Sequence, residues 1–236
     1  MGQSGDLGRG VNPVYHLLIA GTRHRFDPVT LQPLQAIKNG DMAADLLRPY
    51  ATRDLRWVER PTAVLSSPFE RALTTARLAT ADLGIRVRTD ERLRERDFGA
   101  FDGMTGPGIR EQFPDEAARR DLLGKFYYRP PGGESWADVA LRIRSLLATE
   151  GLRHDCERLV VVAHQAVIMV FRYVLEELTE QELLAVDKEE QVANASLTRY
   201  ERDDGGDFTL TAFNVVDHLI AEDEDVTEEP DAAQHP

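Results

Sequence analysis

Three short apolar runs, each followed by a stretch of helical periodicity, constrain the fold of this chain most. The runs are Val14–Ala20, Ala63–Ser66 and Leu159–Ala163, and each has the composition of a strand buried on both faces. Helices are predicted at Asp41–Leu47, Glu70–Leu83, Ser135–Leu147, Ala166–Leu178 and Glu180–Val186. Strands that alternate with helices predict a three-layer α/β fold, in which a doubly wound, mostly parallel sheet is flanked by helices on both faces.

Two weaker strands and one helix start complete the prediction. Ile85–Val87 is short, and Phe208–Phe213 alternates apolar and polar residues as an edge strand does. Thr179 precedes Glu180 and Glu182 and is therefore a predicted N-cap for the last helix.

The length and composition favour one large domain. The chain has 236 residues, of which 42% are hydrophobic, and no linker or repeat divides its central part. Residues 1–12 are rich in glycine and are predicted to be flexible. Residues 13–219 form the expected domain, and residues 220–236 form an acidic tail that is predicted to be disordered.

The net charge and the single cysteine exclude several classes of protein. A net charge of -13 argues against general binding to nucleic acid or to an anionic membrane, but a few arginines in a cleft can still bind a small phosphorylated molecule. Cys156 is the only cysteine, so an intrachain disulfide is excluded and a reducing compartment is expected. The sequence shows no long apolar run and no secretory signal, which predicts a cytoplasmic protein.

Polar residues that follow the predicted strands are the candidates for a site, because ligands bind beyond the carboxyl ends of a doubly wound sheet. Ser67 and Arg71 fit an anion site at a helix start, although a capped surface helix with a solvated arginine explains them equally. His164 fits acid–base or electrostatic work, or is a histidine satisfied by backbone groups. Glu95 is either a proton donor to a leaving alcohol or one member of a solvated charge cluster.

Five segments in order resemble motifs of the histidine phosphatase (phosphoglycerate mutase-like) superfamily. They are SPFERALTTA at 67–76, LRERDFGAFDG at 93–103, PGGESWADVALRI at 131–143, VVVAHQAVI at 160–168 and NASLTRYE at 194–201. The resemblance covers residues 14–215 and implies the fold predicted above. Thr74 and Gln165 stand where the family more often has Gln and Gly.

The resemblance implies phosphoryl transfer without a metal or another cofactor. In this family one histidine attacks phosphorus, and water or a second hydroxyl then discharges the phosphohistidine. By motif, Arg71 is a phosphate-binding arginine, Glu95 the general acid and base, and His164 the second histidine, which also binds phosphate. The implied partner is a small phosphorylated molecule, and because the family is often dimeric, a homodimer is an expectation as well.

The motif that should carry the nucleophile is altered. The family has Arg-His-Gly directly after the first strand, whereas this chain has Ala20-Gly21-Thr22 and only then Arg23-His24. In an ungapped register the nucleophile is missing. In a shifted register His24 is the nucleophile and Arg23 a phosphate ligand, which requires a loop rearrangement that a bend at Gly21 would permit.

Both registers stay open, and each predicts a different function. The shifted register predicts a phosphomonoesterase that hydrolyses a small phosphorylated metabolite, with mutase activity as the less favoured variant. The ungapped register predicts a catalytically impaired family member that binds a phosphorylated ligand or a protein partner through the retained cleft. Residues Lys125–Arg129, before the GGES segment, are expected to lie over the site in either case.

Overall fold

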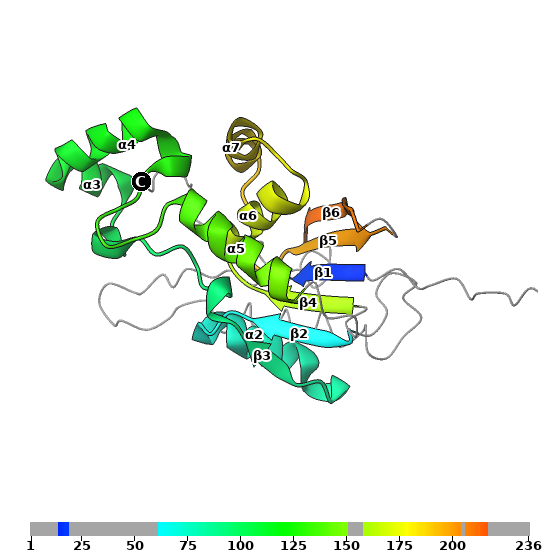
Figure 1. Ribbon diagram of the computed structural model, residues 1–236. Coiled ribbons are helices and arrows are strands. Elements are labelled where there is room, and N and C mark those ends of the chain that lie inside the picture. The colour runs from blue at the N-terminus through cyan, green and yellow to red at the C-terminus, as the bar shows by residue number, and fades with distance from the viewer. Residues whose placement is uncertain (1–13, 19–60, 151–157, 204–205, 217–236) are drawn as a thin grey trace, which may run out of the picture.

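The central element is a six-stranded sheet with the order β3-β2-β4-β1-β5-β6 (Figure 1). The computed structural model describes residues 14–18, 61–150, 158–203 and 206–216. The strands are β1 Val14–Leu18, β2 Ala63–Ser66, β3 Val87–Thr89, β4 Arg158–Val162, β5 Leu197–Arg202 and β6 Phe208–Val215. β1 to β4 pair in parallel, and β5 and β6 are antiparallel. The predicted three-layer fold with a mostly parallel sheet is therefore confirmed.

Helices cover both faces of this sheet. The α-helices are α2 Glu70–Thr80, α3 Gly106–Gln112, α4 Pro114–Tyr127, α5 Trp136–Glu150, α6 Gln165–Leu175 and α7 Glu180–Glu189. α2 lies on one face, and α5 and α6 lie on the other (Figure 1). α3 and α4 form an extension on the side to which β1 and β4 point (Figure 1).

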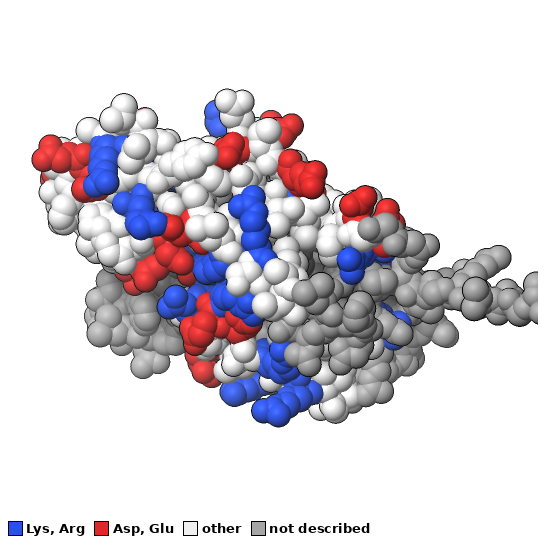
Figure 2. All heavy atoms as spheres, in the orientation of Figure 1, with Lys and Arg blue, Asp and Glu red and all other residues white. Residues whose placement is uncertain are grey.

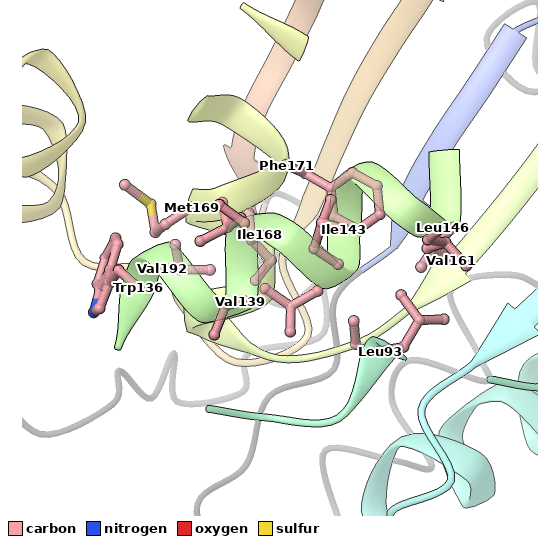
Figure 3. Close-up of a cluster of buried hydrophobic side chains, with 14 of the residues drawn as sticks. Leu93, Trp136, Val139, Ile143, Leu146, Val161, Ile168, Met169, Phe171 and Val192 are labelled. Carbon is pink, nitrogen blue, oxygen red and sulfur yellow. The ribbon is translucent and has the colours of Figure 1, made fainter. Parts of the chain in front are cut away.

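Alternate side chains of the central strands divide the core into two clusters, as the period of two in a strand requires. Val64 of β2 and Val160 of β4 pack with alanines of α2, so small residues let this helix approach the sheet closely. Leu65 and Val161 point to the opposite face and pack with α5 and α6. Figure 3 shows the buried side of α5 in this larger cluster, with its residues facing Leu93 and Val161.

The predicted boundaries agree with the structure to within a few residues. β2 matches its prediction, whereas the strand predicted at Ile85–Val87 lies at Val87–Thr89. The α-helix predicted to reach Leu83 ends at Thr80 and continues as a 3-10 turn, which Gly84 terminates with a φ of 63°. Thr179 caps α7 as predicted, in a reciprocal capping box with Glu182.

Two side-chain contacts tie the end of α4 to α7. No helix was predicted from the sequence at α3 or α4, because their apolar residues do not form a clear buried face; Leu122, for example, is 85% exposed. Lys125 forms an ion pair with Asp187, and the Tyr127 hydroxyl donates a hydrogen bond of 3.0 Å to Glu180. In the segment expected over the site, Phe126 and Tyr128 are buried and Tyr127 is 58% exposed.

The surface carries charges of both signs. On the face in Figure 2, acidic and basic side chains are interspersed around α5, and several basic side chains gather at the lower edge. Among the described helices, none is long and apolar enough to cross a membrane. The predicted helix at residues 41–47 and the predicted flexible and acidic termini lie outside the described residues.

Candidate active site

The carboxyl edge of the parallel strands brings together residues that are far apart in the chain. β2 ends at Ser66 and is followed by Ser67, and β4 ends at Val162 and is followed by Ala163 and His164. Because Ser66 is level with Val162 in the parallel register, the residues after both strands meet at one edge. The structure thus places two predicted site residues, Arg71 at the start of α2 and His164 at the start of α6, next to this edge.

His164 and Ser67 form a buried hydrogen bond. The distance from His164 Nε2 to Ser67 Oγ is 2.8 Å, and neither residue has exposed surface. Ser67 Oγ also accepts the backbone N–H of Phe69 at 3.2 Å, which leaves its own hydrogen to donate to Nε2. This arrangement favours the neutral tautomer with the proton on Nδ1, and Nδ1 has no hydrogen-bond partner within the described part of the chain.

The surroundings of His164 keep its imidazole neutral. Burial lowers the pKa of His164 well below its usual value, and the positive charges of Arg71 and Arg142 lower it further. A neutral imidazole beside a guanidinium can donate a hydrogen bond to an anionic oxygen and is not consumed in an ion pair. The histidine is therefore suited to binding a phosphoryl group at neutral pH.

Phe69 contacts two of the predicted phosphate-binding residues, Arg71 and His164, and sequence reasoning missed it. Its ring centroid lies 5.4 Å from that of His164 in an edge-to-face arrangement, and the guanidinium carbon of Arg71 lies 5.4 Å from the same ring. The ring is 37% exposed. A phenylalanine before a predicted helix carries no local signal for such a role, because the contact depends on His164, which is far from Phe69 in the sequence.

Glu95 follows β3, the strand that lies next to β2 in the sheet. The segment that leads to it is fixed to the same edge, since the N–H of Asp90 donates to the carbonyl of Ser66 at 3.0 Å. Asp90 caps a 3-10 turn over Glu91–Leu93, and the Arg92 guanidinium lowers the pKa of Asp90 through hydrogen bonds. The half-buried Glu95 side chain accepts the N–H of Arg96 at 2.8 Å.

Glu134 and Ser135 stand before α5 but make different contacts. Ser135 caps the helix, since its Oγ accepts the N–H of Asp138 at 3.1 Å. The carboxylate of Glu134 instead binds Arg142 of α5 and the backbone of Asp97. A glutamate side chain is long enough to leave its own helix start, which local capping rules do not anticipate.

The predicted nucleophile His24 and the predicted phosphate ligand Arg23 lie outside the described residues. Their roles therefore stay predictions. Among the residues that the structure describes, no group of three or more His, Cys, Asp or Glu side chains could hold a metal ion.

Comparison with known proteins identifies the family. The model of the histidine phosphatase superfamily (branch 1) matches residues 46–216, which is well over half of the 236 residues. The match begins after the segment in which the first motif is altered.

Two curated relatives illustrate how far sequence similarity extends. A bifunctional protein of Mycobacterium tuberculosis is 43% identical over 82 residues, which are 35% of this chain and 22% of that protein. The chain thus spans under a quarter of that relative. Phosphoglycerate mutase-like protein 4 of Arabidopsis thaliana is 30% identical over 164 residues, which cover 66% of this chain and 65% of that protein.

Solved structures agree with the family match. The structure of a mycobacterial glucosyl-3-phosphoglycerate phosphatase aligns with a TM-score of 0.65 and 25% identity, over 86% of this chain and 99% of that one. A protein of Bacillus stearothermophilus aligns with a TM-score of 0.69 over 87% of this chain and 98% of that one, and its 22% identity supports the fold alone. On the family match, the motifs and the sheet topology, the chain belongs to branch 1 of the histidine phosphatase superfamily.

Proposed function

We propose that this protein is a phosphomonoesterase that transfers a phosphoryl group from a small phosphorylated metabolite to His24 and then to water. One observation carries the proposal: the buried, neutral His164 lies within electrostatic range of Arg71 at the carboxyl edge of the sheet. A buried imidazole nitrogen without a hydrogen-bond partner is costly, and the Nδ1 of His164 has none among the described residues. A phosphoryl oxygen would accept a hydrogen bond from this Nδ1–H, and the positive charge of Arg71 would stabilise the bound anion.

The chemistry runs in two displacements. The neutral His24 imidazole forms a bond to phosphorus while the ester P–O bond breaks, and Glu95 donates its proton to the departing alcohol oxygen. Glu95, now a carboxylate, takes a proton from water, whose oxygen attacks phosphorus and breaks the P–N bond. Arg23, Arg71 and His164 bind the equatorial oxygens in both steps and offset the charge that they carry.

Residue counting favours a second candidate, a binding protein that has lost its nucleophile. Leu18 of β1 is level with Val162 of β4, and His164 comes two residues after Val162. His24 comes six residues after Leu18, so a site built on His24 must absorb four more residues than the one built on His164. The family match, which begins at residue 46, does not include this segment.

Turnover of phosphate esters by the parent, His24→Ala and His164→Ala proteins separates the two candidates. The panel includes sugar phosphates and phosphoglycerates, because one structural neighbour is a glucosyl-3-phosphoglycerate phosphatase. We expect His24→Ala to abolish both turnover and the formation of the acid-labile phosphohistidine intermediate. We expect His164→Ala to lower kcat by about 100-fold or more.

Two results would contradict the proposal. Parental turnover in His24→Ala would remove His24 from the mechanism. A parent that turns over no ester on the panel, yet binds inorganic phosphate in a manner that Arg71→Ala abolishes, would establish the binding protein instead.

A further inference from the structure

The Glu134 carboxylate joins the segment that carries Glu95 to helix α5. Arg142 donates two hydrogen bonds to it, from Nε to Oε1 at 3.0 Å and from Nη2 to Oε2 at 3.1 Å. The backbone N–H of Asp97 donates a third, to Oε2, at 3.1 Å. The Arg142 and Glu134 side chains are only 12% and 21% exposed, so this bidentate, charge-assisted pair is partly shielded from water and has one strongly preferred geometry.

The backbones of the two segments are also in direct contact. Glu134 N–H donates to the Asp97 carbonyl at 2.8 Å, and Arg96 Nε donates to the Glu134 carbonyl at 2.8 Å. A Cβ atom on Gly133 would lie 2.5 Å from the Asp97 carbonyl oxygen, so no other residue fits there without movement. Residues 96 and 97 are therefore held by Glu134 through both its backbone and its carboxylate.

Arg142 links this contact to the phosphate-binding side of the site. Its Nη1 donates to the carbonyl of Arg92, three residues before Glu95. Its positive charge also acts on the His164 imidazole. One guanidinium thus contacts the chain on both sides of Glu95, directly at Arg92 and through Glu134 at Asp97.

We propose that Glu134 and Arg142 are positioning residues that hold Glu95 where it can protonate the leaving alcohol. This inference rests on the proposed function, in which Glu95 is the general acid. Glu95 itself lies on a segment without helix or strand structure, so the hydrogen bonds at positions 92, 96 and 97 replace the rigidity that a regular element would supply. A proton donor that is displaced by about 1 Å loses most of its effect.

Leaving-group dependence distinguishes positioning of a general acid from a general structural role. An alkyl phosphate needs its leaving oxygen protonated, whereas p-nitrophenyl phosphate releases a stable anion that needs little help. The ratio kcat/KM reports steps up to the transfer to His24, so the later hydrolysis does not mask the difference. In Glu134→Gln we expect kcat/KM to fall about tenfold for an alkyl phosphate and less than about twofold for p-nitrophenyl phosphate.

Glu176→Gln is a matched control. Glu176 also accepts two hydrogen bonds from one arginine, Arg172, at 2.8 and 2.9 Å, and a third from Tyr200 at 2.5 Å. It lies just beyond the end of α6 that is opposite His164. We expect Glu176→Gln to reduce stability and to leave the ratio of the two kcat/KM values unchanged.

A measurement without substrate tests the contact itself. In Glu134→Gln the amide hydrogen of Asp97 should exchange about fivefold faster, because the hydrogen bond that protects it is weakened; Glu176→Gln should leave this rate unchanged. If Glu134→Gln does not fold, Arg142→Lys, which keeps the charge and loses the bidentate geometry, is expected to show the same asymmetry between the esters at about threefold.

The outcomes separate this inference from the proposed function. An equal loss on both esters, or an unchanged Asp97 exchange rate, would show that Glu134 does not position Glu95. A parent that hydrolyses neither ester would overturn the proposed function and the catalytic consequence drawn here, whatever the amide exchange shows.

Discussion

At the scale of single residues, burial determines the charge of His164. The imidazole has no exposed surface, its Nε2 is occupied by Ser67, and Arg71 and Arg142 add positive potential. All of these effects disfavour the protonated ring, so the folded protein keeps a neutral histidine where an exposed one would titrate near neutrality.

This neutral histidine should make the protein less stable in mild acid. The pKa of His164 is lowered on folding, so below about pH 6.5 the unfolded chain binds a proton that the folded protein does not bind. The free energy of unfolding therefore decreases as the pH is lowered. Between pH 7.5 and 5.5 we expect the parent to lose about 1.4 kcal/mol more free energy of unfolding than His164→Gln does. Urea unfolding at both pH values measures this difference. The same change in the free energy of unfolding between the two pH values in both proteins would refute the prediction.

At the scale of elements, the contact between residues 97–99 and residues 131–134 fixes the segment with Glu95 without any regular structure. Gly99 has a φ of 54°, and a Cβ atom there would lie 2.2 Å from the Pro131 carbonyl oxygen. The N–H of Ala100 donates to the same carbonyl at 2.9 Å. Glycine is therefore required at this position both by backbone conformation and by space.

Comparing Gly99→Ala with Gly84→Ala separates the cost of the backbone conformation from the cost of the close contact. Gly84 also has a positive φ, of 63°, but nothing lies within 4 Å of an added Cβ. We expect Gly84→Ala to cost about 1 kcal/mol from backbone strain alone, and Gly99→Ala to cost at least about 2 kcal/mol more, because the two segments must also move apart. Thermal and urea unfolding measure both changes; equal costs would mean that the close contact is dispensable.

At the scale of the whole molecule, the extension formed by α3 and α4 is attached to the α/β core by the buried Phe126, which packs in the main core cluster, and by a few polar contacts. The ion pair between Lys125 and Asp187 is largely buried, with side-chain exposures of 18% and 4%. Burial lowers the pKa of Lys125, which the carboxylate of Asp187 opposes. The Lys125 Nζ also lies 5.1 Å from the Trp136 ring, next to the GGES segment.

Removing Asp187 should therefore loosen the extension more than a surface mutation would. We expect Asp187→Asn to lower the free energy of unfolding by about 3 kcal/mol, because it leaves a buried ammonium without its carboxylate. Lys125→Met in the Asp187→Asn background should restore most of that loss, since no charge is then left buried. A double variant as unstable as Asp187→Asn would show that the cost comes from packing and not from charge.

Much of the architecture was predictable because it depends on local patterns. The apolar runs at 14–20, 63–66 and 159–163 locate three strands, and Thr179 with Glu182 defines a helix start from four consecutive residues. The register of β3 and the length of α2 were less predictable, because neighbouring strands and Gly84 determine them. α3 and α4 have no clear apolar face and are held by contacts to residues outside themselves.

The sequence by itself determined the family, and by motif it predicts Arg71, Glu95 and His164 as site residues. Only the tertiary structure decided which of the described side chains act together, because those pairs span long separations. Ser67 contacts His164 across 97 residues, and the Glu134 carboxylate accepts the N–H of Asp97, 37 residues away. Hydrogen bonds between residues far apart in the sequence depend on the complete packing around them, whereas strands, caps and motifs depend on residues within a few positions of one another.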